Sequence, residues 1–168
     1  MPNWTKTYVR YVEGMNFRVG RFAMYLLFVM MAILLWSSVT KVIRVPAIWT
    51  LEMAQFTLVA YYLLGAPYTF QLGTNVRMDL LYARLAPRKQ ALWDAFTVFA
   101  LLFYLGVMLY GAFSSTAYSF ETSERAPSGW RPYLWPIKTI ICFSFVLMIL
   151  QATVHLIRDI AILRGEEL

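Results

Sequence analysis

The sequence is poor in the residues that most enzymes and metal sites require. Its 168 residues include one cysteine and one histidine, and only 14% are charged. The single cysteine, Cys142, forms no disulfide within the chain, and we interpret it as a small packing residue. The single histidine, His155, does not supply both ligands of a bis-histidine haem. The sequence also lacks a Cys/His cluster, a Ser/His/Asp set and a glycine-rich phosphate loop, so we expect no enzymatic activity, no metal and no cofactor.

What the sequence has instead is a set of long stretches without charge. A helix that crosses a bilayer needs roughly 20 apolar residues, at about 1.5 Å of rise each. Stretches of that length run over Phe22–Thr40, Met53–Val76, Ala95–Phe120 and Thr139–Ile157. We therefore predict an all-α fold: one membrane domain over residues 1–168, an integral membrane bundle of four transmembrane helices. The predicted bounds of these helices are residues 22–42, 49–72, 92–118 and 136–158.

The loop between the second and third predicted helices has a pattern of its own. Its apolar residues Val76, Leu80 and Ala83 recur at i, i+4 and i+7, whereas Arg77 and Arg84 lie on another face. This pattern predicts a short interfacial amphipathic helix over residues 75–86, which lies flat in the headgroup layer.

The distribution of basic residues predicts the orientation of the chain. The N-terminal tail, the second loop and the C-terminal tail together hold twice as many Lys and Arg residues as the first and third loops. By the positive-inside rule, we expect both termini in the cytoplasm. Most of the cations flank apolar segments, where they meet anionic headgroups. The net charge of +6 therefore indicates membrane lipids as partners and no nucleic acid.

Glu52, about one turn into the second predicted helix, is a candidate site residue. A carboxylate at this depth is costly unless it is paired. One interpretation is a coupling residue that binds a proton or a cation. The interpretation that we prefer is a structural ion pair with Lys41, Arg44 or Lys138, which the predicted topology places on the same side.

Three further polar residues lie near the opposite side. Asp94 opens the third predicted helix, where a carboxylate complements the helix dipole. It is also expected to pair with Arg21, His155 or Arg158. Gln151 and His155 lie four residues apart on one face of the fourth predicted helix. We expect them to hydrogen-bond to a neighbouring helix of this chain or of a partner.

Several short motifs, in their order and spacing, resemble one known family. They read Trp49-Thr50-Leu51-Glu52-Met53-Ala54-Gln55-Phe56, Leu64-Gly65-Ala66-Pro67-Tyr68-Thr69, Asn75-Val76-Arg77-Met78-Asp79-Leu80-Leu81-Tyr82, Trp135-Pro136-Ile137-Lys138 and Leu150-Gln151. The set is similar to the small membrane subunit of tripartite ATP-independent periplasmic (TRAP) transporters. The resemblance spans roughly Trp36–Arg158. It departs from the family at Leu51, where a second acid is common, and at Asn75, where a histidine is common.

The resemblance implies a scaffold subunit in the bacterial cell inner membrane. Its partners would be a large multi-spanning membrane subunit, which carries the substrate and sodium sites, and a periplasmic solute-binding protein. The solute would be an organic acid or a similar molecule. The large subunit would move its transport domain against a fixed frame that the small subunit widens. In that frame, Arg77, Asp79 and Arg84 are expected to anchor the interfacial helix, and Glu52 to brace the outer end.

Two other functions stay open at this point. One is a self-contained four-helix exporter of the small multidrug type, with Glu52 as its coupling acid. Such exporters are usually shorter and place the acid deep in the first helix. The other is a membrane anchor subunit of a redox complex, in which a second chain supplies the haem ligands.

Overall fold

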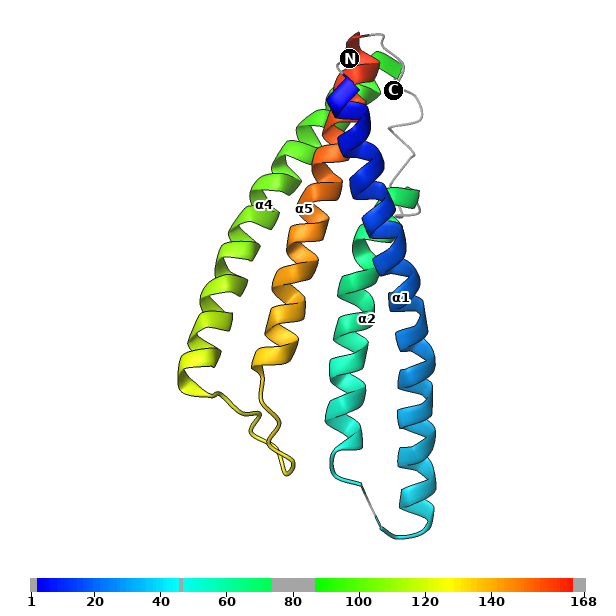
Figure 1. The fold of residues 1–168 in the computed structure, drawn as a ribbon, viewed down its shortest axis with the longest axis vertical. Helices are drawn as coiled ribbons and strands as arrows, with labels where there is room; N and C mark the ends of the chain where they lie inside the picture. The colour runs from blue at the N-terminus through cyan, green and yellow to red at the C-terminus, as the bar shows by residue number, and fades with distance from the viewer. Residues whose placement is uncertain (1–2, 46, 74–86, 165–168) are drawn as a thin grey trace.

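The computed structural model describes residues 3–45, 47–73 and 87–164, and within this part of the chain it is all-α, as predicted (Figure 1). The helices are, in chain order, α1 (Asn3–Val42), α2 (Thr50–Leu72), α4 (Pro87–Thr122) and α5 (Trp135–Arg164). The predicted interfacial helix over residues 75–86, with its expected anchors Arg77, Asp79 and Arg84, lies outside the described residues.

The helices form two hairpins, α1 with α2 and α4 with α5. Helix α5 joins the hairpins because it packs against α2 and α1 as well as against α4. Figure 1 shows that the hairpins lie close together at the end where both termini lie and diverge towards the opposite end. We call the first the closed end. The other, which carries residues 43–45, 47–49 and 123–134, is the open end.

Within the described residues, three helices are long and apolar enough to cross a bilayer: Trp4–Val42, Phe96–Thr122 and Trp135–Ala161. The prediction of helices that are long and apolar enough to span a membrane is therefore confirmed for three of the expected four. Helix α2 has 23 residues, which suffices at about 1.5 Å of rise per residue. It is not among these three helices, and it contains the polar and ring-bearing residues Gln55, Tyr61, Tyr62 and Pro67. Its crossing stays a prediction.

The first helix begins at Asn3, so its predicted start at about residue 22 is wrong. The reason is tertiary packing. Val9 and Val12 form a buried cluster with Val154 of α5, and Tyr8 and Leu150 pack against it. A segment that has a buried face of this kind continues the helix in spite of its charged residues, because Lys6, Arg10 and Arg18 are exposed and Glu13 pairs with Arg158 of α5. Helices α4 and α5 also extend beyond their predicted bounds at both ends.

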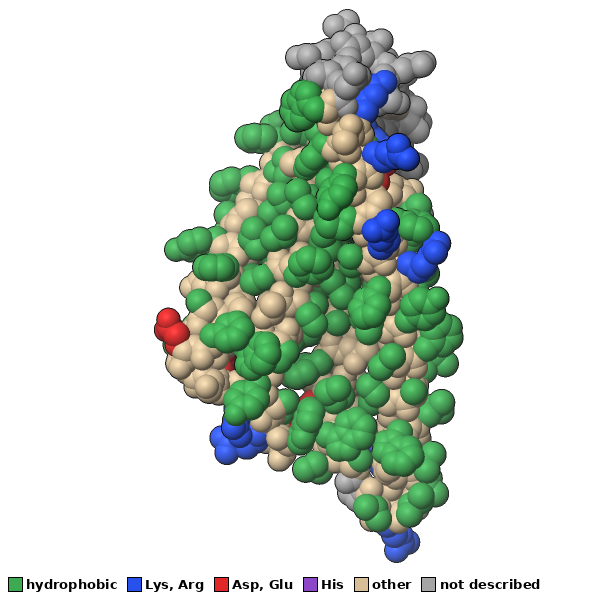
Figure 2. Space-filling model, viewed as in Figure 1, with side chains coloured by type: hydrophobic (Ala, Val, Ile, Leu, Met, Phe, Trp, Pro, Cys, Tyr) green, Lys and Arg blue, Asp and Glu red, His purple; other side chains and the backbone are tan. Residues whose placement is uncertain are grey.

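Helix α5 is the centre of the bundle. Its Leu147, Gln151 and Val154 are fully buried, and Ala152 packs against Val98 and Leu105 of α4. The outer helices instead turn large apolar side chains outward, and Figure 2 shows hydrophobic side chains over most of the visible face. A helix that is apolar on its outer face as well is typical of a membrane span or of a segment buried in a larger assembly.

Helices α1 and α2 come very close together at Gly20. A Cβ atom at this position would lie 2.5 Å from the Cβ of Tyr68 on α2, so a side chain does not fit here without movement of the helices. One turn earlier, the ring of Phe17 packs edge-on against Tyr68, with ring centroids 5.8 Å apart. The absence of a side chain at residue 20 thus sets the spacing of the first hairpin.

Candidate functional site: polar contacts at the two ends of the bundle

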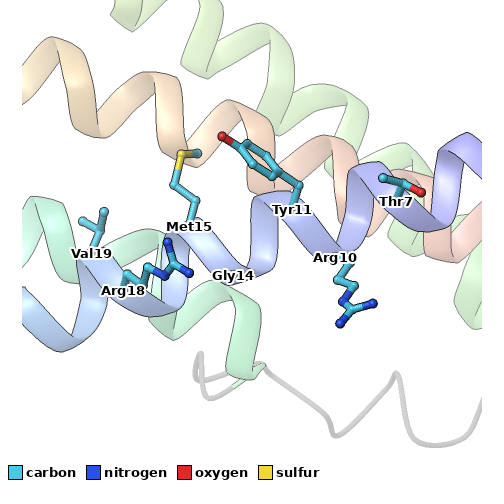
Figure 3. Close-up of a pocket in the computed structure, with 7 residues that line it drawn as sticks. All are labelled: Thr7, Arg10, Tyr11, Gly14, Met15, Arg18 and Val19. Carbon is cyan, nitrogen blue, oxygen red and sulfur yellow. The ribbon is translucent and has the colours of Figure 1, made fainter.

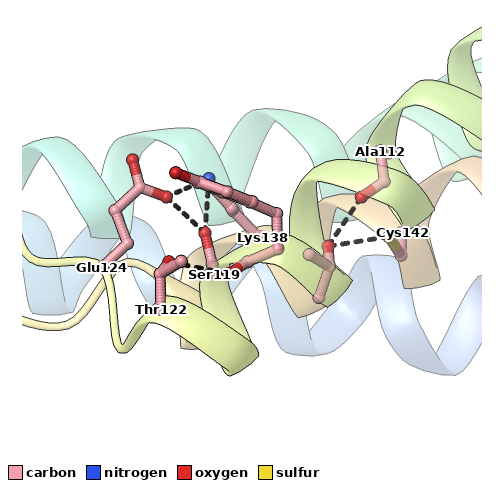
Figure 4. A network of polar contacts seen from close by, with 8 residues as sticks. Ala112, Ser119, Thr122, Glu124, Lys138 and Cys142 are labelled. Atoms are coloured by element: carbon pink, nitrogen blue, oxygen red, sulfur yellow. Dashed lines mark hydrogen bonds and ion pairs between the residues drawn. The ribbon is translucent and has the colours of Figure 1, made fainter.

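A three-residue polar cluster closes the α4–α5 hairpin at the open end (Figure 4). Lys138, in the first turn of α5, donates hydrogen bonds to Glu124 Oε2 at 2.7 Å and to Ser119 Oγ at 2.5 Å. The Ser119 hydroxyl donates in turn to Glu124 Oε2 at 2.5 Å. Ser119 is fully buried near the end of α4, and Glu124 follows the helix. The cluster therefore ties both helices to the segment between them.

The pKa of Glu124 is held below its usual value in this cluster. The hydrogen bond from Lys138 is the main cause, followed by that from Ser119 and by the charge of Lys138. Together these outweigh partial burial, which raises the pKa. Glu124 is therefore a carboxylate at neutral pH. It makes a structural contact and does not act as a proton carrier.

The segment between α4 and α5 is itself well ordered. Arg125 and Tyr133 pair as an isolated antiparallel bridge, and the Arg125 guanidinium both stacks on the Tyr133 ring and donates to its hydroxyl. Backbone hydrogen bonds join Ala126 to Pro132 and Leu134 to Glu124. Ser123 adopts a positive φ of 49°, which turns the chain out of α4. These contacts hold the loop in one conformation at the open end.

The expected pair of Glu52 with Lys138 is not formed in the described part of the chain. Lys138 is bonded to Glu124 and Ser119. Lys41, at the end of α1, and Arg44, just beyond it, are both exposed. The Oε2 atom of Glu52 is buried and finds no hydrogen-bond partner among the described residues. The structure thus leaves Glu52 with one oxygen to be satisfied from elsewhere.

At the closed end, Arg158 of α5 forms an ion pair with Glu13 of α1, with Nη2 and Oε1 2.5 Å apart. Glu13 was not predicted as a partner, because the first helix was expected to begin only at about residue 22. The expected partner of Arg158 was Asp94, whose side chain lies outside the described residues. Arg21 instead stacks on Phe17 of its own helix.

The prediction that Gln151 and His155 bond to neighbouring helices is confirmed. Gln151 Oε1 accepts a hydrogen bond of 2.6 Å from the Asn16 amide on α1. His155 Nε2 lies 3.0 Å from the Phe70 carbonyl oxygen on α2. Since a carbonyl only accepts, Nε2 carries the proton. These two bonds attach α5 to both helices of the first hairpin.

One more contact crosses the closed end. The Tyr8 hydroxyl lies 2.8 Å from Thr153 Oγ1. Thr153 already donates to the Leu150 carbonyl, so Tyr8 is the donor. Asn16 and Tyr8 were not singled out from the sequence, although Val9, Val12 and Asn16 have the three- and four-residue spacing of a buried helix face. That spacing is the signal that would have found them.

The N-terminal part of α1 also carries a shallow hollow on its outer face, with a volume of about 650 Å³ (Figure 3). The described residues that line it come from α1, and they include Arg10, Tyr11, Gly14 and Arg18. Lys and Arg side chains gather along α1 near the closed end (Figure 2). Basic and aromatic residues together are typical of a surface at the level of lipid headgroups.

The described residues contain no group of three or more His, Cys, Asp or Glu side chains that would hold a metal ion. The one cysteine, Cys142, packs 3.3 Å from the hydroxyl of Thr116, between α4 and α5 (Figure 4). The polar contacts at both ends are hydrogen bonds and ion pairs that hold helices together.

Comparison with known proteins gives one match. A family model described as tripartite ATP-independent periplasmic transporters, DctQ component, matches residues 30–162, well over half of the chain. The match includes all of α2 and α4 and most of α5. No curated protein and no solved structure matches the sequence.

Proposed function

Since the chain belongs to the DctQ component family of TRAP transporters and is thus a TRAP small membrane subunit, we propose that it is the fixed frame of a sodium-coupled importer. In this proposal, the large multi-spanning subunit holds the substrate and sodium sites. A periplasmic solute-binding protein delivers an organic acid or a similar solute. The chain itself binds neither solute nor sodium; it widens the frame against which the large subunit moves.

The observation that carries this proposal is the contrast between the inner and the outer helices of the bundle. Buried hydrogen bonds and an ion pair fix α5 to α1 and α2 at the closed end. The outer helix α4 has a face of aromatic side chains that stay exposed in the described chain. Its members are exposed and recur at spacings of three, four and seven residues: Phe96, Phe99, Phe103, Tyr110 and Phe113. A braced bundle with a wide apolar outer face supports the role of a frame.

The charged residues at the helix ends belong to this frame. We propose that Glu52, Lys138, Asp94 and Arg158 hold helices or partners in place and take no part in ion coupling. The bonds of Lys138 to Glu124 and of Arg158 to Glu13 support this view, because each ties two elements of the bundle together. The anchors of the interfacial segment, Arg77, Asp79 and Arg84, have the same proposed role towards headgroups or the large subunit.

We further propose that the closed end faces the cytoplasm and that the chain crosses the bacterial inner membrane several times. The excess of Lys and Arg in the segments at this end supports the orientation. The two termini lie at the same end, as an even number of crossings requires.

The proposal is tested by capture of the large subunit on the tagged chain in mild detergent. Replacement of Phe103 and Phe113 by Ala removes two exposed rings from the aromatic face of α4. We expect the large subunit to be lost from the purified complex while the variant keeps its helicity. The matched control replaces Phe28 and Leu35, which are exposed on α1. Equal capture by wild type and by the α4 variant would contradict this assignment of the interface.

A further inference from the structure

The hollow on the N-terminal part of α1, here called the basic hollow, has two arginines in a regular arrangement (Figure 3). Arg10, Gly14 and Arg18 follow one another at intervals of four residues, so they lie in one row along the helix. Both arginines are exposed, and no atom of the described residues lies within 4 Å of the Cβ position of Gly14. Gly14 therefore leaves open space between two positively charged side chains.

The described chain does not balance the charge of these two arginines. The described residues that line the basic hollow include no Asp or Glu. Glu13 of the same helix is bonded to Arg158 of α5 instead. Guanidinium groups bind phosphate groups through paired hydrogen bonds. Two exposed arginines with space between them thus complement a phosphate group.

A second hollow, with a volume of about 540 Å³, adjoins the basic hollow. The two hollows share Arg18 and Val19. Apolar side chains of three helices line the second one, and we call it the apolar hollow: Phe22 of α1, Leu64 of α2, and Ile140 and Phe143 of α5. Thr139 also lines it, but its hydroxyl already donates to the Trp135 carbonyl. A phosphate site is therefore joined to an apolar site between the hairpins.

The apolar hollow extends along the bundle by about the depth of one lipid leaflet. Asn16 and Gln151 are hydrogen-bonded, so they lie at one level. Thr139 lies 12 residues before Gln151, which is roughly 18 Å towards the open end. Arg18 lies two residues beyond Asn16, or roughly 3 Å in the same direction. The hollow thus spans about 15 Å, half of the hydrocarbon layer of a bilayer.

We propose that the two hollows together bind one anionic phospholipid, phosphatidylglycerol. Its phosphate lies over Gly14 between Arg10 and Arg18, and one acyl chain extends along the apolar hollow. A free phosphate ion would use the basic hollow alone. Phosphatidylethanolamine and phosphatidylcholine carry a positive charge beside the phosphate, which the two guanidinium groups repel. This inference does not depend on the proposed role in import.

Native mass spectrometry of the full chain tests the proposal. The probes are phosphatidylglycerol, phosphatidylethanolamine and phosphatidylcholine with identical acyl chains. We expect one phosphatidylglycerol to be retained, with a preference of about tenfold over the other two, as charge-assisted hydrogen bonds supply. Arg18→Gln removes this preference. The matched control Arg21→Gln keeps it, because Arg21 is exposed on the same helix but is not among the residues that line either hollow.

A second pair of variants tests the apolar hollow. Thr139→Trp places a large ring in this hollow, and we expect it to abolish retention of phosphatidylglycerol while helicity is kept. Thr97→Trp is the matched control and should leave retention unchanged. Thr97 is exposed on α4, and its hydroxyl donates to the carbonyl four residues earlier, as that of Thr139 does.

Four results would overturn the proposal. They are equal retention of the three lipids by the wild type, an unchanged preference in Arg18→Gln, an equal loss of preference in Arg21→Gln, and full retention in Thr139→Trp. Excess inorganic phosphate separates a lipid site from a plain anion site. We expect it to leave the bound lipid in place, because the acyl chain is held by the apolar hollow. Release of the lipid by phosphate would contradict this.

Discussion

The Asn16 amide donates a hydrogen bond of 2.6 Å to Gln151 Oε1, and this bond joins two fully buried side chains that are 135 residues apart in the chain. It fixes the first half of α1 against the second half of α5. The bond satisfies only half of the pair, because Asn16 Oδ1 and Gln151 Nε2 find no partner among the described residues. The contact thus favours one alignment of the helices more than it adds to stability.

This half-satisfied pair predicts a marked non-additivity. Asn16→Leu or Gln151→Leu alone leaves a buried amide with no partner, and we expect each to destabilise the bundle by about 1–2 kcal/mol. The double replacement removes both amides, so its cost is expected to be smaller than that of either single variant. Unfolding by SDS titration, followed by circular dichroism, measures the three free energies. Additive costs in the double variant would rule out a direct coupling.

Gly20 predicts the opposite of the usual effect of a glycine replacement. In a helix, Gly→Ala is normally stabilising by roughly 0.5–1 kcal/mol. At Gly20 the new Cβ would lie 2.5 Å from the Tyr68 side chain, so we expect Gly20→Ala to destabilise the α1–α2 hairpin. Gly14→Ala is the matched control on the same helix, since no atom of the described residues lies within 4 Å of its Cβ position. The same unfolding titration should give free-energy changes of opposite sign for the two variants. An equal gain in both would show that α1 and α2 do not approach closely here.

The cluster around Glu124 predicts that the bundle loses stability at acid pH. Because its pKa is lowered in the folded chain, the carboxylate contributes stability above its ordinary pKa of about 4.5. This contribution is lost as the pH falls through the lowered value. We expect wild type to melt above Glu124→Gln at pH 7, and the difference to vanish in strong acid. A difference that stays constant from neutral to strongly acid pH would show that Lys138 is bonded elsewhere.

The ion pair of Arg158 with Glu13 is partly exposed, so its contribution to stability should be small. Side-chain exposure is 42% for Arg158 and 21% for Glu13. Glu13→Gln is expected to cost about 0.5 kcal/mol at low salt and less at high salt. Glu13→Lys and Arg158→Glu should each lower the stability of the bundle, and the two combined should recover most of the stability that either one loses alone. A lack of recovery would indicate that Arg158 has another partner, and Asp94 would then be the first candidate.

The sequence predicted the architecture of the bundle better than its contacts. The long charge-free stretches identified the helices because length and apolarity alone determine what crosses a bilayer. The start of α1 was wrong because the N-terminal segment is charged on its outer faces, and only its packing against α5 reveals the buried one. Gln151 and His155 were correctly expected to bond to neighbouring helices, since a buried polar side chain requires a partner.

The partners of the charged residues were harder to predict than their locations. Lys138 was expected to pair with Glu52, but a turn at Ser123 brings Glu124 closer. That turn depends on a positive φ at a residue that is not glycine, for which the sequence carries no signal. For the same reason, the sequence did not show that an oxygen of Glu52 is left without a partner.

The central claim, that this subunit is a fixed frame and not a transporter by itself, is tested most directly by uptake into proteoliposomes under an inward sodium gradient. Vesicles would contain this chain alone, the large subunit alone, or both, each with the solute-binding protein supplied outside. We predict sodium-dependent uptake only where both membrane subunits are present, and none with this chain alone. Accumulation of solute in vesicles that hold only this chain would contradict the account.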